Sequence, residues 1–292
     1  MFFIKLLSTL PLAVLYLFSD ILYFFMLHVL RYRKKVVVQN LKKSFPDKSD
    51  EEISKITKAF YKNLADLTVE TLKMPSIKKD EIVKRVKFKN IDLPNSYLNK
   101  GSSILVLTGH QCNWEWLLLA CSIHSEYPID GVYKPMHIES LDKLFLDMRS
   151  RFGANPLPMK DVFRSVIRNK NEVRVLALVA DQTPPHGEIQ HFTDFLSQNT
   201  PFFVGADKIA QHTQYPVLFV EMIRLKRGYY EAEFHVVKEA PYKKGAFEII
   251  EAYAKLLEKS INKHPSDWLW SHKRWKYRDF KTRKNLRDDL TV

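Results

Sequence analysis

Residues 104–120 read ILVLTGHQCNWEWLLLA, and this stretch joins an apolar run to a turn that carries chemically active side chains. The run 104–107 is typical of a buried strand, Gly109 of its exit, and the segment from Trp114 onward of a helix. A helix rotates by ~100° per residue, so residues five apart would point ~140° apart if the whole stretch were helical. The strand–turn–helix interpretation instead places His110 in the turn and Glu115 in the first helical turn, from which it can fold back toward His110.

A histidine beside a carboxylate is a common arrangement for proton transfer. A carboxylate on one imidazole nitrogen fixes the tautomer and leaves the other nitrogen free to take a proton from a hydroxyl group. We therefore predict that His110 is a general base and that Glu115 is its orienting partner. The alternative is that the pair only caps the helix or forms a polar contact at the junction.

Strands and helices alternate along the chain. We predict strands at 129–133, 175–179, 217–223 and 229–237, a short one within 82–93, and helices at 36–45, 49–72, 141–152, 163–170, 205–214 and 247–263. This pattern predicts an α/β fold with a mostly parallel central sheet flanked by helices. In such sheets ligands bind beyond the carboxyl ends of the strands, and both His110 and Asp181 directly follow predicted strands.

The composition is that of a globular protein with a strong positive charge. The 292 residues are 46% hydrophobic and 27% charged, which excludes a disordered chain. The only cysteines, Cys112 and Cys121, exclude a disulfide framework and fit a reducing compartment. The histidines have no ligand-like spacing, so we expect neither a metal nor a cofactor. The net charge of +13 predicts an acidic partner: a nucleic acid, an anionic membrane or an acidic protein.

The N-terminus favours the membrane over nucleic acid. Residues 6–30 are apolar with Asp20 as the only formal charge, and a basic cluster follows at 31–35. A bilayer-spanning helix needs ~20 apolar residues, and such clusters are typical of its cytoplasmic side. We predict an N-terminal membrane-anchoring helix with its basic flank at 1–35 and a catalytic domain at 36–292. Pro11 and Asp20 leave a shallow, monotopic segment open beside a spanning one, and a buried core helix is the third alternative.

Motifs along nearly the whole chain resemble those of the late (secondary) acyltransferases of lipid A biosynthesis. Together with the N-terminal apolar segment they are, in order, NLKKSFP at 40–46, GHQCNWE at 109–115, GVYKP at 131–135, RSR at 149–151, ADQ at 180–182, PFF at 201–203 and HPSDWLWSHKRWK at 264–276. The resemblance implies transfer of a fatty acyl chain from acyl carrier protein to a hydroxyl of a lipid A precursor. It also implies location at the bacterial inner membrane, with the catalytic domain on the cytoplasmic face.

The resemblance assigns roles to individual residues. His110 matches the family's base, Glu115 its partner, and Arg149 a further active-site arginine. Substrate-binding residues are expected at Asn113, Tyr133, Lys134, Arg151 and Asp181. Lys134 replaces the arginine of the family's Tyr-Arg-Pro segment, which bears on acceptor contacts, while Asn113 and Asp181 are alternatively caps of a helix and of a turn.

Several alternatives stay open at this point. The donor is either acyl carrier protein or acyl-CoA, and the acceptor is a lipid A precursor, an aminolipid or another glycolipid. The oxyanion of the reaction is expected to be bound by Arg149 or by backbone N–H groups near Gly109. Basic residues at 31–35 and 273–284 are expected to attract acidic substrates. The non-enzymatic alternative is a basic membrane protein that binds an anionic partner.

Overall fold

A central sheet of seven strands organises the computed structural model, which describes residues 2–277. The strands lie in the order β1 (Val86–Phe88), β9 (Tyr229–Lys238), β8 (Val217–Lys226), β2 (Ile104–Thr108), β5 (Val175–Val179), β3 (Ile129–Tyr133) and β4 (Ala154–Pro158). All neighbours are parallel except β8 and β9, which form an antiparallel pair. The predicted mostly parallel α/β sheet is therefore confirmed.

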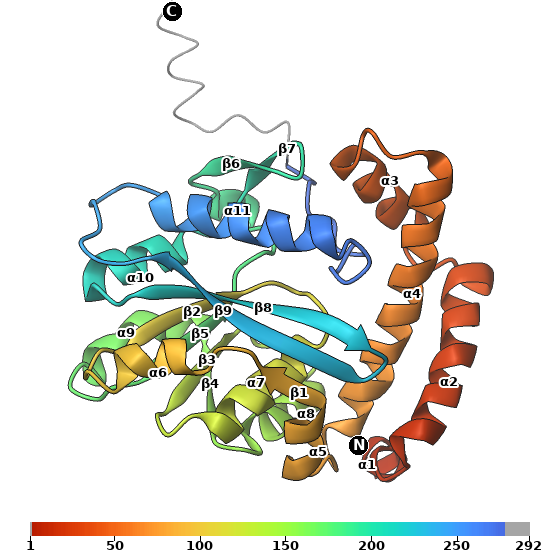
Figure 1. The fold of residues 1–292 in the computed structure, drawn as a ribbon, viewed down its shortest axis with the longest axis horizontal. Coiled ribbons are helices and arrows are strands. Elements are labelled where there is room, and N and C mark those ends of the chain that lie inside the picture. The colour runs from red at the N-terminus through yellow and green to blue at the C-terminus, as the bar shows by residue number, and fades with distance from the viewer. Residues whose placement is uncertain (1, 278–292) are drawn as a thin grey trace, which may run out of the picture.

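Helices cover both faces of this sheet (Figure 1). Helices α10 (Gly205–Thr213) and α11 (Glu248–Lys263) lie on one face, and the opposite face carries α5 (Lys79–Arg85), α6 (Asp92–Leu98), α7 (Trp114–His124) and α8 (Glu139–Ser150). Each face has its own buried apolar cluster. Because alternate side chains of a strand point to opposite faces, β2 contributes Leu105 and Leu107 to the first cluster and Ile104 and Val106 to the second.

Most predicted elements are present, with shifted ends. Helix α4 (Asp50–Lys73) begins with a capping box in which Ser49 and Glu52 bond reciprocally to each other's backbone N–H groups. The short strand predicted within 82–93 is present as the three-residue β1, which lies between the end of α5 and the start of α6. Elements that the sequence did not predict are α5, α6, β4, the hairpin β6 (Phe192–Phe195) and β7 (Gln198–Pro201), and the 3₁₀ turns η2 (Met159–Asp161) and η3 (His186–Glu188). The helix predicted at 163–170 is α9 (Val162–Arg168).

The N-terminal apolar segment is not one straight helix. It divides into α1 (Phe2–Ser8), α2 (Leu12–Phe24) and the π-helical turn η1 (Phe25–Val29), before α3 (Lys34–Ser44). The break falls at Pro11, whose ring cannot continue a helix from the preceding turn. Within the described residues, Leu12–Val29 is the one helical stretch long and apolar enough to cross a membrane. It nevertheless packs beside α4, where Leu12 and Leu15 enter the core (Figure 1).

Candidate active site

His110 lies just beyond the carboxyl end of β2, in a turn that passes close beneath α11. Gly109 makes this passage possible, since a Cβ atom there would lie 2.7 Å from Leu257 Cδ1 and 3.4 Å from Asp181 Oδ2. The backbone around His110 is fixed on the other side as well. Its carbonyl accepts from Leu269 N–H at 3.0 Å, and Gln111 pairs with Trp268 in a short antiparallel bridge. The turn therefore has little freedom to move the imidazole.

The carboxylate that orients His110 is Asp181. Nδ1 of His110 lies 2.5 Å from Asp181 Oδ1, and the backbone N–H of His110 donates to Oδ2 at 2.8 Å. Trp268 Nε1–H donates to the same Oδ2 at 2.7 Å. Asp181 lies two residues beyond the end of β5, which pairs in register with β2, so the sheet itself brings Asp181 and His110 together. The bond to Asp181 holds the proton on Nδ1 and leaves Nε2 as the basic nitrogen.

Asp181 is held in its charged form. Its side chain is only 2% exposed, and burial alone would raise its pKa. The charge and hydrogen bonds of His110 and the Trp268 N–H outweigh burial and lower the pKa of Asp181 to about 2. A carboxylate that stays ionised at any working pH stabilises the imidazolium that forms when His110 takes a proton.

The predicted contact between Glu115 and His110 is corrected by this geometry. Both oxygens of Glu115 are bound by Arg149 of α8, from Nε at 2.9 Å and Nη2 at 2.5 Å. The cause is local: α7 starts at Trp114 with Asn113 as its N-cap, so Glu115 extends toward α8 instead of folding back to the turn. The hydrogen bonds and charge of Glu115 outweigh burial and raise the pKa of Arg149. Glu115 and Arg149 form a bidentate ion pair in the cavity wall.

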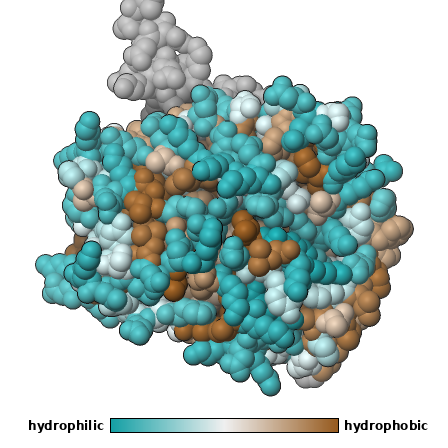
Figure 2. Space-filling view, viewed as in Figure 1, coloured by the Kyte–Doolittle hydropathy of each residue, from teal (hydrophilic) through white to brown (hydrophobic). Residues whose placement is uncertain are grey.

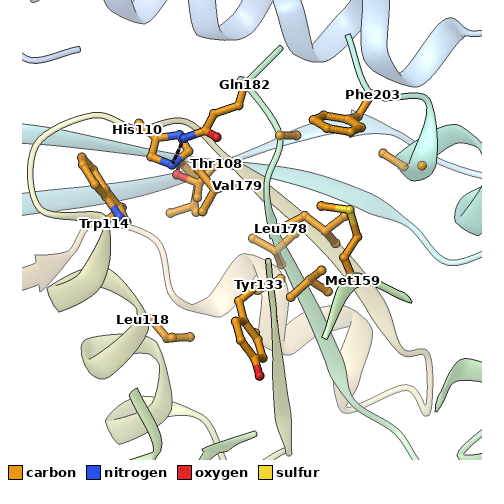
Figure 3. Close-up of a pocket in the computed structure, with 18 of the residues that line it drawn as sticks. Thr108, His110, Trp114, Leu118, Tyr133, Met159, Leu178, Val179, Gln182 and Phe203 are labelled. Carbon is orange, nitrogen blue, oxygen red and sulfur yellow. Dashed lines mark hydrogen bonds between the residues drawn. The ribbon is translucent and has the colours of Figure 1, made fainter. Parts of the chain in front are cut away.

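Nε2 of His110 opens into a large apolar cavity. The cavity has a volume of about 880 Å³, near the upper end of the roughly 300–1,000 Å³ usual for small-molecule sites. The Gln182 amide nitrogen lies 3.1 Å from Nε2, and the Trp114 ring stands edge-on to the imidazole at 4.8 Å between centroids (Figure 3). The atom suited to take a proton is therefore the one that a ligand in the cavity reaches.

The other predicted site residues divide between the cavity and its supports. Tyr133 and Lys134 line the cavity at the end of β3. Asn113 is fully buried; its side-chain Oδ1 caps α7 by accepting from Trp116 N–H, and its side-chain Nδ2 donates to Glu70. Arg151 donates to the carbonyl of Met74. Among the described residues, the cavity lining includes none of Asn113, Arg151 and Asp181. Asp181 instead contacts His110, which does line the cavity.

Sequence reasoning missed residues that the structure brings to the site. Gln182 follows Asp181, and Trp268 binds Asp181 from the C-terminal loop. His272 lines the cavity, and burial together with the charge of Arg274 lowers its pKa to about 4. Arg274, expected at the surface, is fully buried over the Phe202 ring. The clustering of aromatic and basic residues at 264–276 was the available signal, but composition alone pointed to a surface.

Part of the predicted basic tail can be placed. Lys273 and Lys276 are exposed, and Lys276 lines the cavity; residues 278–284 lie outside the described residues.

Away from the cavity, Glu221, Glu233 and His235 bring ligand-type atoms within 4.8 Å of one another on β8 and β9. Lys89 already pairs with Glu233 at 2.8 Å, so an ion is not needed to balance that carboxylate.

Comparison with known families decides the class of chemistry. The family model described as bacterial lipid A biosynthesis acyltransferase matches residues 1–277, which is nearly the whole chain. The chain belongs to this family. It is therefore an acyltransferase for lipid A-type acceptors, from a family associated with bacterial membranes. No curated protein matches the sequence of this lipid A acyltransferase family member.

Proposed function

We propose that this acyltransferase transfers a fatty acyl chain from an acyl carrier protein thioester to a hydroxyl of a lipid A precursor, with His110 as general base. The observation that carries the proposal is the Nε2 atom of an Asp181-bound histidine opening into an apolar cavity of about 880 Å³. The family supplies the acceptor class, and the cavity supplies the space for hydrocarbon.

The reaction follows from the tautomer. Nε2 of His110 accepts the proton of the acceptor hydroxyl as its oxygen attacks the thioester carbonyl carbon. The new C–O bond gives a tetrahedral intermediate whose oxyanion needs hydrogen-bond donors. When the C–S bond breaks, the imidazolium returns the proton to the leaving sulfur. His110 is restored and no cofactor is consumed.

Gln182 is our candidate for the oxyanion donor. Its amide nitrogen already lies 3.1 Å from Nε2, where the hydroxyl of the acceptor would bind. The backbone donors expected near Gly109 are less suited, because the N–H groups of His110 and Gln111 are bound to Asp181 and to the Gly109 carbonyl. Arg149 retains Nη1 beside the cavity after binding Glu115 through Nε and Nη2.

A donor competition assay tests this function. The purified full chain is given a lipid A precursor in mixed micelles, with acyl carrier protein and CoA thioesters of the same chain at equal concentration. We expect transfer chiefly from the carrier protein, with an apparent affinity that falls steeply as salt shortens the Debye length from ~10 to ~3 Å. The chemical step, measured in single turnovers, should change little.

Other outcomes select the alternatives. Transfer from CoA alone, insensitive to salt, would contradict the carrier-protein donor. Acylation of an aminolipid with none on the lipid A precursor would replace the acceptor. Absence of turnover with every donor and acceptor would leave only a binding role.

We further propose that residues 1–35 hold the enzyme in the plane of the inner membrane, with the catalytic domain in the cytoplasm. Large apolar side chains follow helical spacing on the outer side of α2 and η1, and each is at least 46% exposed: Leu17, Phe18, Ile21, Phe24, Phe25 and Val29. Figure 2 shows apolar side chains along the edge that α2 forms in Figure 1. Arg31, Arg33 and Lys35 border this stripe, and such a combination suits an anionic lipid surface.

Polar contacts favour an in-plane segment over a spanning one. Lys73 donates to the carbonyls of Ser8 and Leu10 at 2.7 and 2.9 Å. Further along α4, the hydroxyls of α2 donate to buried carboxylates, Tyr16 to Glu70 at 2.8 Å and Ser19 to Asp66 at 2.6 Å, and Tyr61 donates to the carbonyl of Tyr32. A helix tied to α4 along its length cannot cross the bilayer without taking those charged groups along, at about 3 kcal/mol or more each.

Cysteine labelling distinguishes the two arrangements. Lys5→Cys and Lys276→Cys proteins are treated with a membrane-impermeant maleimide in inverted inner-membrane vesicles and in spheroplasts. We expect both positions to react only in the inverted vesicles, because both lie on the cytoplasmic side. Labelling of Lys5→Cys in spheroplasts would establish a spanning anchor. In vesicle binding, Phe18→Glu with Ile21→Glu should cost about 100-fold in affinity, whereas Val236→Glu, at an exposed position of β9, should not.

A further inference from the structure

The cavity has two lobes on opposite faces of the sheet. Alternate residues of β5 show this division: Val175 and Ala177 belong to one face and Leu178 to the other, and all three line the cavity. We call the part beneath α7 the α7 lobe and the part beside α10 the α10 lobe. They meet at the carboxyl ends of β3 and β5, where Tyr133 lies between Leu118 on one side and Phe203 on the other (Figure 3).

The α7 lobe is deep and enclosed. It follows β2 from His110 back to Ile104, a run of about 20 Å at the rise of a parallel strand. Its walls are apolar side chains of α7 and the sheet, and α6 closes the far end with Pro94 and Leu98. A single extended acyl chain fits this shape, with its thioester carbon at His110. This is the place for the chain that is transferred.

The α10 lobe is open to the surface. Val162, Phe203, Ala206 and Ile209 form its inner wall. Its rim carries Met159, Phe163 and Ile167, which recur at every fourth position and are 43%, 43% and 57% exposed. The first two of them also line the cavity. The apolar lining thus continues from the interior to an exposed apolar stripe. Isolated apolar side chains on a protein surface form no such continuous patch.

We propose that the α10 lobe binds an acyl chain of the acceptor lipid. The inference rests on the proposed function, because acyl transfer onto a lipid must bring two hydrocarbon-bearing substrates to the same Nε2. The enclosed lobe suits a chain that is threaded in whole. The open lobe suits a chain that remains part of a larger lipid, since that chain enters sideways across the rim while its head group stays outside. The acceptor hydroxyl then approaches His110 from the side of β5 opposite to the donor chain.

Two glycines give a matched pair of probes. Gly131 lines the α7 lobe, and a Cβ there would meet Leu118 Cδ2 at 3.4 Å, an ordinary contact. Gly205 lines the α10 lobe at the start of α10, and a Cβ there would have no neighbour within 4 Å. Neither glycine has a positive φ, so both accept side chains without backbone strain. Each lobe can therefore be filled separately.

Steady-state kinetics of filled variants test the assignment. In Gly205→Ala, Gly205→Leu and Gly205→Phe, KM for a lipid A precursor should rise with side-chain size, by about tenfold or more for phenylalanine. The preferred chain length in a series of acyl carrier protein thioesters should not change. In Gly131→Val the pattern should reverse, with a shorter preferred donor chain and an unchanged KM for the acceptor. Melting curves confirm that each variant is folded.

Photolabelling supplies a second measurement on the unaltered enzyme. A lipid A precursor with a diazirine at the end of one acyl chain should label residues 159–168 or 203–209. A carrier-protein thioester with the same group should label 91–98 or 117–121. Exchanged labelling, or a Gly205→Phe enzyme with a shortened donor chain and unaltered acceptor KM, would overturn the assignment. Wild-type protein without turnover would instead contradict the proposed function, so the two failures are distinguishable.

Discussion

Replacing His110 by alanine should lower kcat for acyl transfer by about 1,000-fold, in the middle of the 10²–10⁴ range for general acid–base catalysis. KM for both substrates should change little, because the imidazole acts on the reacting atoms and contributes a small part of the binding surface. Single-turnover transfer from a radiolabelled thioester measures the chemical step. His124→Ala is the matched control: this α7 histidine bonds to the carbonyl of Ala120 and does not line the cavity. A rate within tenfold of wild type for His110→Ala would exclude the mechanism.

Asp181→Asn should reduce kcat by about 100-fold or more, because the low pKa of Asp181 keeps a negative charge beside His110 at working pH. Removing that charge leaves the imidazolium that forms during proton transfer without its counter-ion. Glu115→Gln should lower kcat much less, because both oxygens of Glu115 are bound by Arg149. Single-turnover transfer measures both variants, and the reverse order of losses would restore Glu115 as the partner of His110.

The same pKa predicts how Asp181 affects stability. Its folded-state pKa of about 2 lies below the ordinary value of 3.8, so the stabilisation is present above pH ~4 and is lost as the pH falls through ~2. The difference in unfolding free energy between wild type and Asp181→Asn should therefore shrink by about 2 kcal/mol over that interval.

Local sequence signals explain why the central strands and long helices could be predicted. The runs at β2 and β5 are short, apolar and followed by turn residues, and α4 carries its own capping box. Strand β4 was missed because Pro156 and Pro158 argue against a strand, yet both are tolerated where β4 forms the edge of the sheet. The hairpin β6–β7 was missed because its turn uses Leu196 and Ser197 at positive φ, where glycine or asparagine is the usual signal.

The partner of His110 could not be identified from neighbouring residues. Glu115 was favoured because it is near in sequence, whereas Asp181 is 71 residues away and adjacent only through the pairing of β2 with β5. The prediction that both His110 and Asp181 follow strands contained the necessary signal. What it lacked was strand order, which follows from tertiary packing.

Breaking the Glu115–Arg149 pair should give the largest stability effect among the site residues. The side chains are 7% and 22% exposed, so removing one leaves a largely desolvated charge, which typically costs about 3–5 kcal/mol. Glu115→Leu and Arg149→Met should each lower the unfolding free energy by that order. The double variant should recover most of it, because an apolar pair of similar volume replaces both charges. Chemical denaturation of the four proteins gives the coupling energy of the cycle.

Activity in the same four proteins separates a structural pair from a functional one. Arg149 lines the cavity and keeps Nη1 free of Glu115, so we expect the stable double variant to stay at least 100-fold slower than wild type. Arg149→Lys keeps the charge but cannot form the two parallel bonds to Glu115, and it should recover stability only in part. If the double variant regained both stability and turnover, the pair would serve only to join α7 to α8. The oxyanion would then depend on Gln182, and Gln182→Leu should abolish the activity that remains.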